Sequence, residues 1–210
     1  MPIAIQHKRG ILANLPTLVA GEFYYATDTD QLFIGPTPNL VGAFNGVSVA
    51  DQTINAATTA LLTGSLIAIP VGKLRIGSVF KYRISLSKTA AGTAANTFTF
   101  RIGTNGTTAD AAICTFALPV GTGVIDVGFI EITITIRGPL SASCIAQGHL
   151  LMTHNLAATG LSTLPGVAIN STSGAFNATT AGLKASLSCT TAASTVLTFQ
   201  QVIAETLNLR

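Results

Sequence analysis

The sequence predicts an all-β protein: an antiparallel β-sandwich, jelly-roll-like in character, preceded by an N-terminal arm that contains a β-hairpin. Three observations predict this class. Apolar and polar residues alternate along many short segments, turn residues separate those segments, and no stretch has a helical period with capping residues. Alternation with period two, rich in β-branched and aromatic residues, is typical of half-buried antiparallel strands.

Residues 1–45 differ from the rest of the chain and are expected to form an attachment arm. Residues 21–35 contain an aromatic segment, an Asp/Thr turn and a second apolar segment, which together predict one compact hairpin. An isolated hairpin is at best marginally stable in water. We therefore expect a neighbour to stabilise it, either other copies of the chain or the assembly on which it docks. A Gly-Pro-Thr-Pro-Asn break at 35–39 ends the hairpin, and residues 46–57 are interpreted as a linker.

Residues 58–210 are expected to form the sandwich knob. The clearest strand has four isoleucines on one face, at positions 130, 132, 134 and 136. Turn residues separate the predicted strands, and Asn105-Gly106 can form a tight hairpin. Residues 155–182 are long and weakly patterned, and a loop of that length is usually functional or packed on a partner. The predicted strands are 61–69, 79–87, 97–102, 111–118, 128–137, 143–154, 183–189 and 195–206.

The composition indicates an oligomer. Charged residues make up 9% of the chain, against about 25% in an average soluble domain. The apolar share of 48% is ordinary, so small polar and small apolar residues replace the missing charges. A surface with so few charges promotes association. We therefore expect much of it to lie against partner subunits.

The net charge of +3 does not by itself indicate nucleic-acid binding, and no nucleic-acid partner is expected. Its distribution is uneven, because no acidic residue lies between Asp51 and Asp110. We interpret the basic residues there as the solvated outer face of two or three strands. The alternative is a basic groove for an acidic partner. The basic residues concerned are Lys73, Arg75, Lys81, Arg83, Lys88 and Arg101.

Neither membrane insertion nor secretion is expected. The sequence contains no run of 18 apolar residues, and residues 6–9 interrupt any apolar signal segment near the N-terminus. The three cysteines, Cys114, Cys144 and Cys189, are odd in number and widely spaced. This spacing indicates reduced, buried thiols made in a cytoplasm rather than a disulfide framework.

The search for catalytic or metal-binding groups yields few candidates. His149 and His154 have opposite parity along one predicted strand and should point to opposite faces, and no metal-ligand spacing occurs. Asp110 and Asp126 are the only carboxylate pair considered for sugar hydrolysis, and a turn or capping role is favoured for both. We therefore predict a protein that is not an enzyme and has no cofactor or metal.

The N-terminal residues resemble a known family. The order Ile-Gln-basic-Arg-Gly at 5–10, then Gly21-Glu22, then Thr27-Asp28-Thr29, then Leu32-Phe33-Ile34-Gly35 is similar to the N-terminal segment of phage tail-fibre and receptor-binding proteins. The resemblance runs from Ile5 to Gly35. It implies a homotrimer attached to the virion, assembled in the bacterial cytoplasm, with distal domains for host recognition. The chain departs from long fibres in its size, because it ends after one sandwich.

The resemblance therefore predicts a trimeric tail-fibre or baseplate appendage attached to other virion proteins through its arm. Two alternatives stay open: a capsid decoration (cement) protein, and a carbohydrate-binding or depolymerase module that uses residues 155–182 and the basic strand face on a host surface glycan. The aromatic residues of the hairpin can serve the interface or internal packing. The predicted attachment residues are Gln6, Arg9, Glu22, Phe23, Tyr24, Tyr25, Asp28, Leu32 and Phe33.

Overall fold

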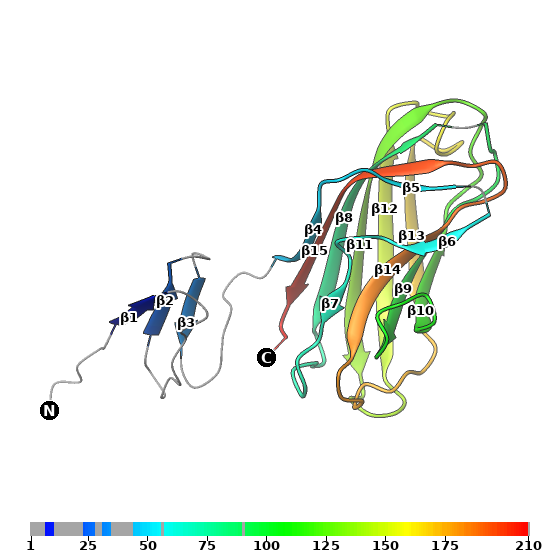
Figure 1. Ribbon diagram of the computed structural model, residues 1–210. Helices are drawn as coiled ribbons and strands as arrows, with labels where there is room; N and C mark the ends of the chain where they lie inside the picture. Colours follow the sequence, from blue (N-terminus) through cyan, green and yellow to red (C-terminus); the bar gives the residue numbers. More distant parts are fainter. Residues whose placement is uncertain are drawn as a thin grey trace, which may run out of the picture. The chain divides into compact units, whose positions relative to one another are not determined.

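The computed structural model describes residues 7–10, 23–27, 31–34, 44–55, 57–89 and 91–209. The chain divides into two compact units, Met1–Ala43 and Phe44–Arg210. The regular secondary structure of the described residues consists of β-strands, which confirms the predicted all-β class (Figure 1). Among these residues there is no helix with the length and hydrophobicity to cross a bilayer.

The N-terminal unit contains a three-stranded sheet in the order β1 (His7–Gly10), β2 (Phe23–Ala26) and β3 (Gln31–Ile34). Strands β2 and β3 pair antiparallel, which confirms a hairpin within residues 21–35. Strand β1 adds to this hairpin as the parallel neighbour of β2. The Tyr24 side chain is buried, and a Cβ atom at Gly10 would lie 2.7 Å from its hydroxyl oxygen. Glycine at position 10 therefore lets the Tyr24 ring approach β1.

The C-terminal unit is a sandwich of two antiparallel sheets, which lie face to face in Figure 1. The larger sheet has seven strands in the order β13-β12-β11-β8-β15-β4, with β5 also paired to β15. Its strands are β4 (Phe44–Ser48), β5 (Gln52–Ile54), β8 (Val79–Lys88), β11 (Asp126–Gly138), β12 (Ile145–His154), β13 (Gly166–Thr172) and β15 (Leu197–Leu207).

The smaller sheet has five strands in the order β10-β9-β14-β6, with β7 also paired to β14. Its strands are β6 (Thr59–Leu61), β7 (Ile67–Ala68), β9 (Thr97–Gly103), β10 (Ala111–Ala117) and β14 (Lys184–Thr190). The sandwich as a whole agrees with the predicted architecture, because alternating strands from both sheets turn one face toward a shared core.

The core lies between the sheets and is centred on β11. The four isoleucines at positions 130, 132, 134 and 136 are each fully buried, as the alternation predicted. Aromatic rings join the two layers: Phe80 of β8 lies 5.4 Å from Phe100 of β9 between ring centroids, and Phe98 of β9 meets Phe199 of β15 edge-on at 6.1 Å. Each such buried side chain contributes about 1.5–3 kcal/mol through removal of apolar surface from water.

The segment 46–57 differs from the linker that we expected. It contains most of β4 and all of β5, and both strands pair antiparallel with β15. The reason is that β15 lies beside β8 on one side only, and its other edge gains backbone hydrogen bonds from these two strands. The sequence-based boundary at residue 58 therefore falls inside the sandwich.

Three further elements differ from the sequence-based expectation. Residues 61–69 do not form one strand, because β6 ends at Leu61 and β7 begins only at Ile67. Between the two strands lies a turn in which the Ser65 amide donates to Leu62 O at 3.0 Å. The segment 155–182 contains β13, which was not predicted because the small residues of that segment give no clear alternation of apolar and polar positions. The Asn105-Gly106 pair lies in a connection that spans residues 104–110 rather than in a two-residue turn. There the Asp110 carboxylate accepts hydrogen bonds from the backbone N–H groups of residues 105, 106 and 107, which stabilises the wider loop.

Candidate functional site

The outer face of the seven-stranded sheet carries exposed apolar side chains, paired charged side chains and a depression. Along β8 and β11 the even-numbered residues point into the core, so the odd-numbered residues point outward. On this face Val127 is 40% exposed, Phe129 41% and Leu151 48%. Large apolar side chains left on a rigid sheet surface are candidates for contact with a ligand or partner.

Four charged side chains cross the middle of the outer face as a chain of ion pairs. Lys81 Nζ lies 3.1 Å from Glu131 Oε1, Glu131 Oε2 lies 3.7 Å from Arg83 Nε, and Arg83 Nη1 lies 3.3 Å from Glu205 Oε1. Two basic and two acidic groups therefore neutralise one another across β8, β11 and β15.

The positions of the basic residues do not form the basic groove that we considered as an alternative. Of the remaining basic residues between 51 and 110, Lys88 is buried at the end of β8, and Arg101 lies on β9 of the other sheet. Lys73 and Arg75 lie between β7 and β8. The six basic residues are therefore spread over separate parts of the sandwich.

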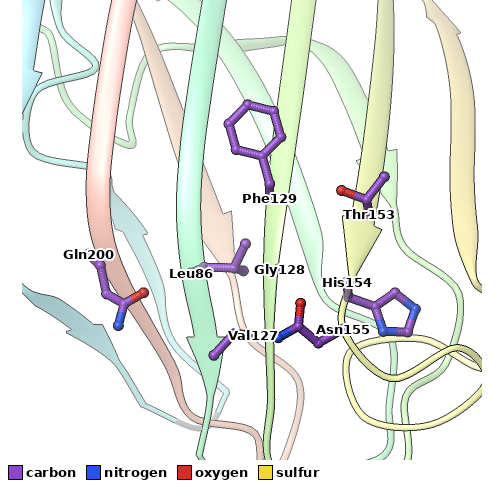
Figure 2. Close-up of a pocket in the computed structure, with 8 residues that line it drawn as sticks. All are labelled: Leu86, Val127, Gly128, Phe129, Thr153, His154, Asn155 and Gln200. Carbon is purple, nitrogen blue, oxygen red and sulfur yellow. The ribbon is translucent and has the colours of Figure 1, made fainter.

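A depression with a volume of about 230 Å³ lies at one end of the outer face. Four adjacent strands contribute to it, because Gln200 comes from β15, Leu86 from β8, Phe129 from β11 and Thr153 from β12 (Figure 2). The residues that line it are Leu86, Val127, Gly128, Phe129, Thr153, His154, Asn155 and Gln200.

A β-bulge in β15 shapes one wall of this depression. The pairing of β15 with β8 shifts by one residue between Phe199 and Gln201, so Gln200 has no opposite residue on β8. As a result Gln200 and Gln201 are both exposed, between the buried Phe199 and Val202. Bulges commonly redirect side chains next to functional sites.

The imidazole of His154 belongs to the lining but is directed into the protein. Its side chain is fully buried, with Nδ1 2.7 Å from Asp126 Oδ2 and Nε2 2.7 Å from Leu164 O. Both ring nitrogens therefore lie within hydrogen-bond distance of protein oxygen atoms. The predicted opposite orientation of the two histidines is confirmed, because His149 is exposed on the outer face.

Asp126 is the centre of a buried polar cluster that holds two loops to the end of the sheet. Its carboxylate accepts hydrogen bonds from Val127 N at 2.8 Å and Leu161 N at 3.0 Å, in addition to the contact with His154. Nearby, the buried Lys88 ammonium donates to the backbone oxygens of residues 122 and 124. Burial lowers the pKa of Lys88, and the negative charge of Asp126 opposes that shift.

The carboxylate pair considered for hydrolysis is not brought together. Asp110 closes the loop next to Gly103, at one end of β9, whereas Asp126 lies opposite Lys88 in the backbone register of β11 and β8, at the other end of the sandwich. Both carboxylates accept backbone hydrogen bonds, in agreement with the turn and capping roles that we favoured. Among the described residues, no group of three or more His, Cys, Asp or Glu side chains could hold a metal ion.

The three cysteines are free and buried, as the sequence predicted. Burial raises the pKa of the Cys114 thiol to about 11, although a hydrogen bond with Ser171 opposes this shift. Burial also raises the pKa of Cys144 and of Cys189. These thiols behave as small core residues rather than as nucleophiles.

The predicted attachment residues fall into three groups. Tyr24 is buried, so it serves internal packing, whereas Arg9 and Tyr25 are exposed and lie side by side as backbone partners on β1 and β2. Phe23, Leu32 and Phe33 lie on β2 and β3, but their side chains are outside the described part of the structure. Gln6, Glu22 and Asp28 lie outside the described residues altogether.

Three residues that line the depression were not predicted from the sequence, namely Phe129, Asn155 and Gln200. Two signals were present. Phe129 is an aromatic residue on the polar side of the isoleucine strand, and Phe199-Gln200-Gln201-Val202 places two polar residues between two apolar ones. The first signal indicates an exposed ring, and the second breaks the alternation in the way that a bulge does.

Neither a protein-family model nor a curated protein matches the sequence. The structure is similar to the CBM2 module of the evolved Dit protein of Lactobacillus casei BL23 phage J-1, with a TM-score of 0.33, 10% identity and coverage of 94% of this chain and 84% of that chain. It is also similar to a legume lectin-like domain from Entamoeba histolytica, with a TM-score of 0.24, 10% identity and coverage of 74% and 89%. A third similar structure, from infectious bursal disease virus strain Gx, has a TM-score of 0.21, 14% identity and coverage of 84% and 45%.

Proposed function

We propose that the chain is a non-enzymatic structural protein of a bacteriophage particle, a homotrimeric tail-fibre or baseplate appendage that its N-terminal unit attaches to other virion proteins. The observation that supports this most directly is the division of the chain into a small unit, Met1–Ala43, and a self-contained sandwich. The N-terminal resemblance to phage tail proteins lies within the small unit.

The small unit has the properties of a docking element. Its three strands have four residues each, and chains of about 40 residues rarely build a sufficient core without partners. Arg9 and Tyr25 are adjacent and exposed there, and both residue types are enriched at protein interfaces. The low charge content of the chain supports self-association, and the number of three subunits is what the N-terminal resemblance implies.

The test is incorporation into particles. Full-length chain and a truncated chain of residues 44–210 are each supplied to a phage that lacks its own copy, and the purified particles are analysed by quantitative mass spectrometry. We expect the full-length chain to be incorporated and the truncated chain to be absent. Incorporation of the truncated chain at the full-length amount would contradict the proposal.

The copy number per particle separates the appendage from the alternative of a capsid decoration protein. A small multiple of three supports a tail or baseplate appendage. A number close to that of the major capsid protein supports a decoration role on the head. Sedimentation equilibrium of the purified chain tests the trimer independently, and a monomer at micromolar concentration would contradict it.

The depression on the outer face favours a second role for the same chain. An appendage whose sandwich is a separate unit from its attachment unit can use the exposed face around Phe129 to recognise a host surface. This role is compatible with attachment through residues 1–43, because it uses a different unit of the chain.

A further inference from the structure

We infer that the depression beside Phe129 binds one neutral sugar unit of a surface glycan. This inference rests on the proposed function, because it assigns a ligand class to the sandwich of an appendage that contacts a host surface. It names a site that the N-terminal resemblance does not include.

The Phe129 ring provides the apolar part of the site. Its backbone partners on the two neighbouring strands are Thr153 of β12 and Ser85 of β8, both of which have small side chains. The ring is 41% exposed on a rigid central strand for this reason. An aromatic ring fixed in this way offers a flat apolar surface, and the C–H face of a pyranose ring is a matching flat apolar surface.

Neutral polar groups surround the ring. Gln200 and Asn155 line the depression with side-chain amides, and Thr153 adds a hydroxyl. Figure 2 shows the Gln200 and Asn155 amides on either side of the Leu86 and Val127 side chains. In the described part of the chain, neither amide has a hydrogen-bond partner within the protein, so both can donate to and accept from ligand hydroxyl groups.

The charges near the depression argue against an ionic ligand. The imidazole of His154 is turned inward and its hydrogen bonds go to Asp126 and Leu164. Farther along the face, Lys81 and Arg83 are paired with Glu131 and Glu205. A carboxylate or phosphate group in the depression would find no free cationic side chain among the lining residues.

The depression is smaller than the pockets that hold drug-sized molecules. Its volume is about 230 Å³, whereas pockets for drug-sized molecules span about 300–1,000 Å³. The rest of a glycan chain would extend over the open outer face, which offers Thr and Gln side chains.

The walls are fixed before a ligand arrives. Asn155 follows His154, and the buried contact between His154 and Asp126 holds the end of β12. The backbone N–H of Asn155 also donates to Val127 O at 3.0 Å. The bulge holds Gln200 on the other wall. A preformed site reduces the entropy lost on binding, which helps a small ligand with few contacts.

The first experiment measures binding by saturation-transfer NMR with the full-length protein. The probes are glucose, galactose, rhamnose, N-acetylglucosamine and glucuronic acid, each as free sugar and as a short oligosaccharide. We expect at least one neutral sugar to bind, and the Phe129→Ala and Gln200→Ala variants to weaken that binding about tenfold, which corresponds to roughly 1.4 kcal/mol. Val71→Ala is the matched control, because it removes an exposed apolar side chain from the turn between β7 and β8, outside both the depression and the outer face of the sheet. Binding of glucuronic acid alone, or binding that Phe129→Ala leaves unchanged, would overturn the inference.

The second experiment separates a glycan from a protein partner. Host cell envelopes are treated either with periodate, which cleaves sugar diols, or with protease, and binding of the full-length protein is measured by sedimentation. We expect periodate and Phe129→Ala to reduce binding and protease to leave it intact. The opposite pattern, or binding unaffected by Phe129→Ala, would overturn the inference. Particles that carry Phe129→Ala should keep the normal copy number, so a failure of the sugar site is distinguishable from a failure of attachment.

Discussion

Lys88, Asp126 and His154 form a buried polar cluster at one end of the sandwich, and their contacts are structural. Every polar atom of the Asp126 carboxylate and both nitrogens of His154 have partners within the protein. A histidine in contact with an aspartate is an arrangement that also occurs in catalytic sites. Here the two side chains are fully buried, so a substrate cannot reach them.

The first prediction concerns the Asp126 carboxylate. Asp126→Asn keeps the shape but removes the negative charge, which leaves Lys88 buried beside a neutral amide. We expect a loss of about 3 kcal/mol in the free energy of unfolding, because the buried carboxylate accepts hydrogen bonds from two backbone N–H groups and contacts His154, and hydrogen bonds to a charged group contribute more than neutral ones. Urea unfolding measures it. Asp51→Asn, at an exposed position, is the control and should change stability by less than about 0.5 kcal/mol. Equal effects of both substitutions would contradict the structural role.

The second prediction concerns the buried thiols at alkaline pH. An acid whose pKa is raised by folding keeps its proton in the folded state while the unfolded state loses it. Its stabilising contribution is therefore complete below about pH 8.5 and is lost as the pH rises further. For Cys114 this loss continues to the folded-state pKa of about 11, with a slope of at most about 1.4 kcal/mol per pH unit.

The unfolding free energy measured between pH 7.5 and pH 10.5 checks this sign. Cys114→Ala should lower stability at pH 7.5, because it removes buried volume, but it should also flatten the decline with pH. Lys88 acts in the opposite direction, because its lowered pKa lets the folded state release a proton earlier than the unfolded state does. If the unfolding free energy of the wild-type protein rises above pH 9, the thiols do not dominate the dependence of stability on pH.

At the scale of elements, the sequence predicted the strands that are long and strictly alternating. Strand β11 has thirteen residues with four buried isoleucines, and its pattern leaves no alternative assignment. The elements that the sequence did not predict are short or rich in small residues. Strands β4 and β5 have five and three residues, and their existence depends on β15, which is distant in sequence. Pairing of that kind is a tertiary effect that local alternation does not encode.

The candidate site could be predicted only in part for the same reason. The parity of Phe129 in the isoleucine strand indicates an exposed ring, but its exposure depends on the small Ser85 and Thr153 as neighbours, and that depends on sheet order. Asn155 and Gln200 are about 45 residues apart in sequence, and only the arrangement of β12, β11, β8 and β15 brings them to one depression.

The third prediction uses the bulge in β15. Deletion of Gln200 removes the one unpaired residue, so Phe199 stays inward and Gln201 stays outward. We expect the variant to fold with a modest change in stability and to lose sugar binding. Deletion of Thr133 is the control, because it lies in a regular stretch of β11 and moves half of the isoleucines to the wrong face. Circular dichroism and thermal unfolding measure the folding of both deletion variants, and saturation-transfer NMR measures sugar binding by the Gln200 deletion. Failure of the Gln200 deletion to fold would contradict the tolerance expected at a bulge.

At the scale of the whole molecule, the hydrophobic core of the sandwich lies entirely within residues 54–209. The division of the chain places the start of this unit at Phe44. The sequence predicted a boundary near residue 58, because residues 46–57 lack a strong pattern. The difference matters for any truncated form, since β4 and β5 cover β15.

The fourth prediction compares two truncated chains. Residues 44–210 should fold and unfold with a midpoint within a few degrees of the full-length chain, because they retain the complete core. Residues 58–210 lack β4, β5 and the buried Ile54, so we expect a midpoint lower by about 10 °C or more and a tendency to aggregate. Differential scanning calorimetry measures both midpoints. Equal stability of the two truncated chains would show that residues 44–57 contribute nothing to the sandwich.

The short strands that border the sandwich have a further consequence. On one side, both sheets end in strands of two to five residues, namely β4, β5, β6 and β7. On the other side, the edges β10 and β13 are joined through Ser171, whose hydroxyl accepts from Thr115 N at 3.2 Å. A bordering strand that is short or already bonded is a poor template for a strand from another molecule. The edges of the sandwich are therefore poor starting points for fibril growth, and contacts between two sandwiches are left to their side-chain surfaces.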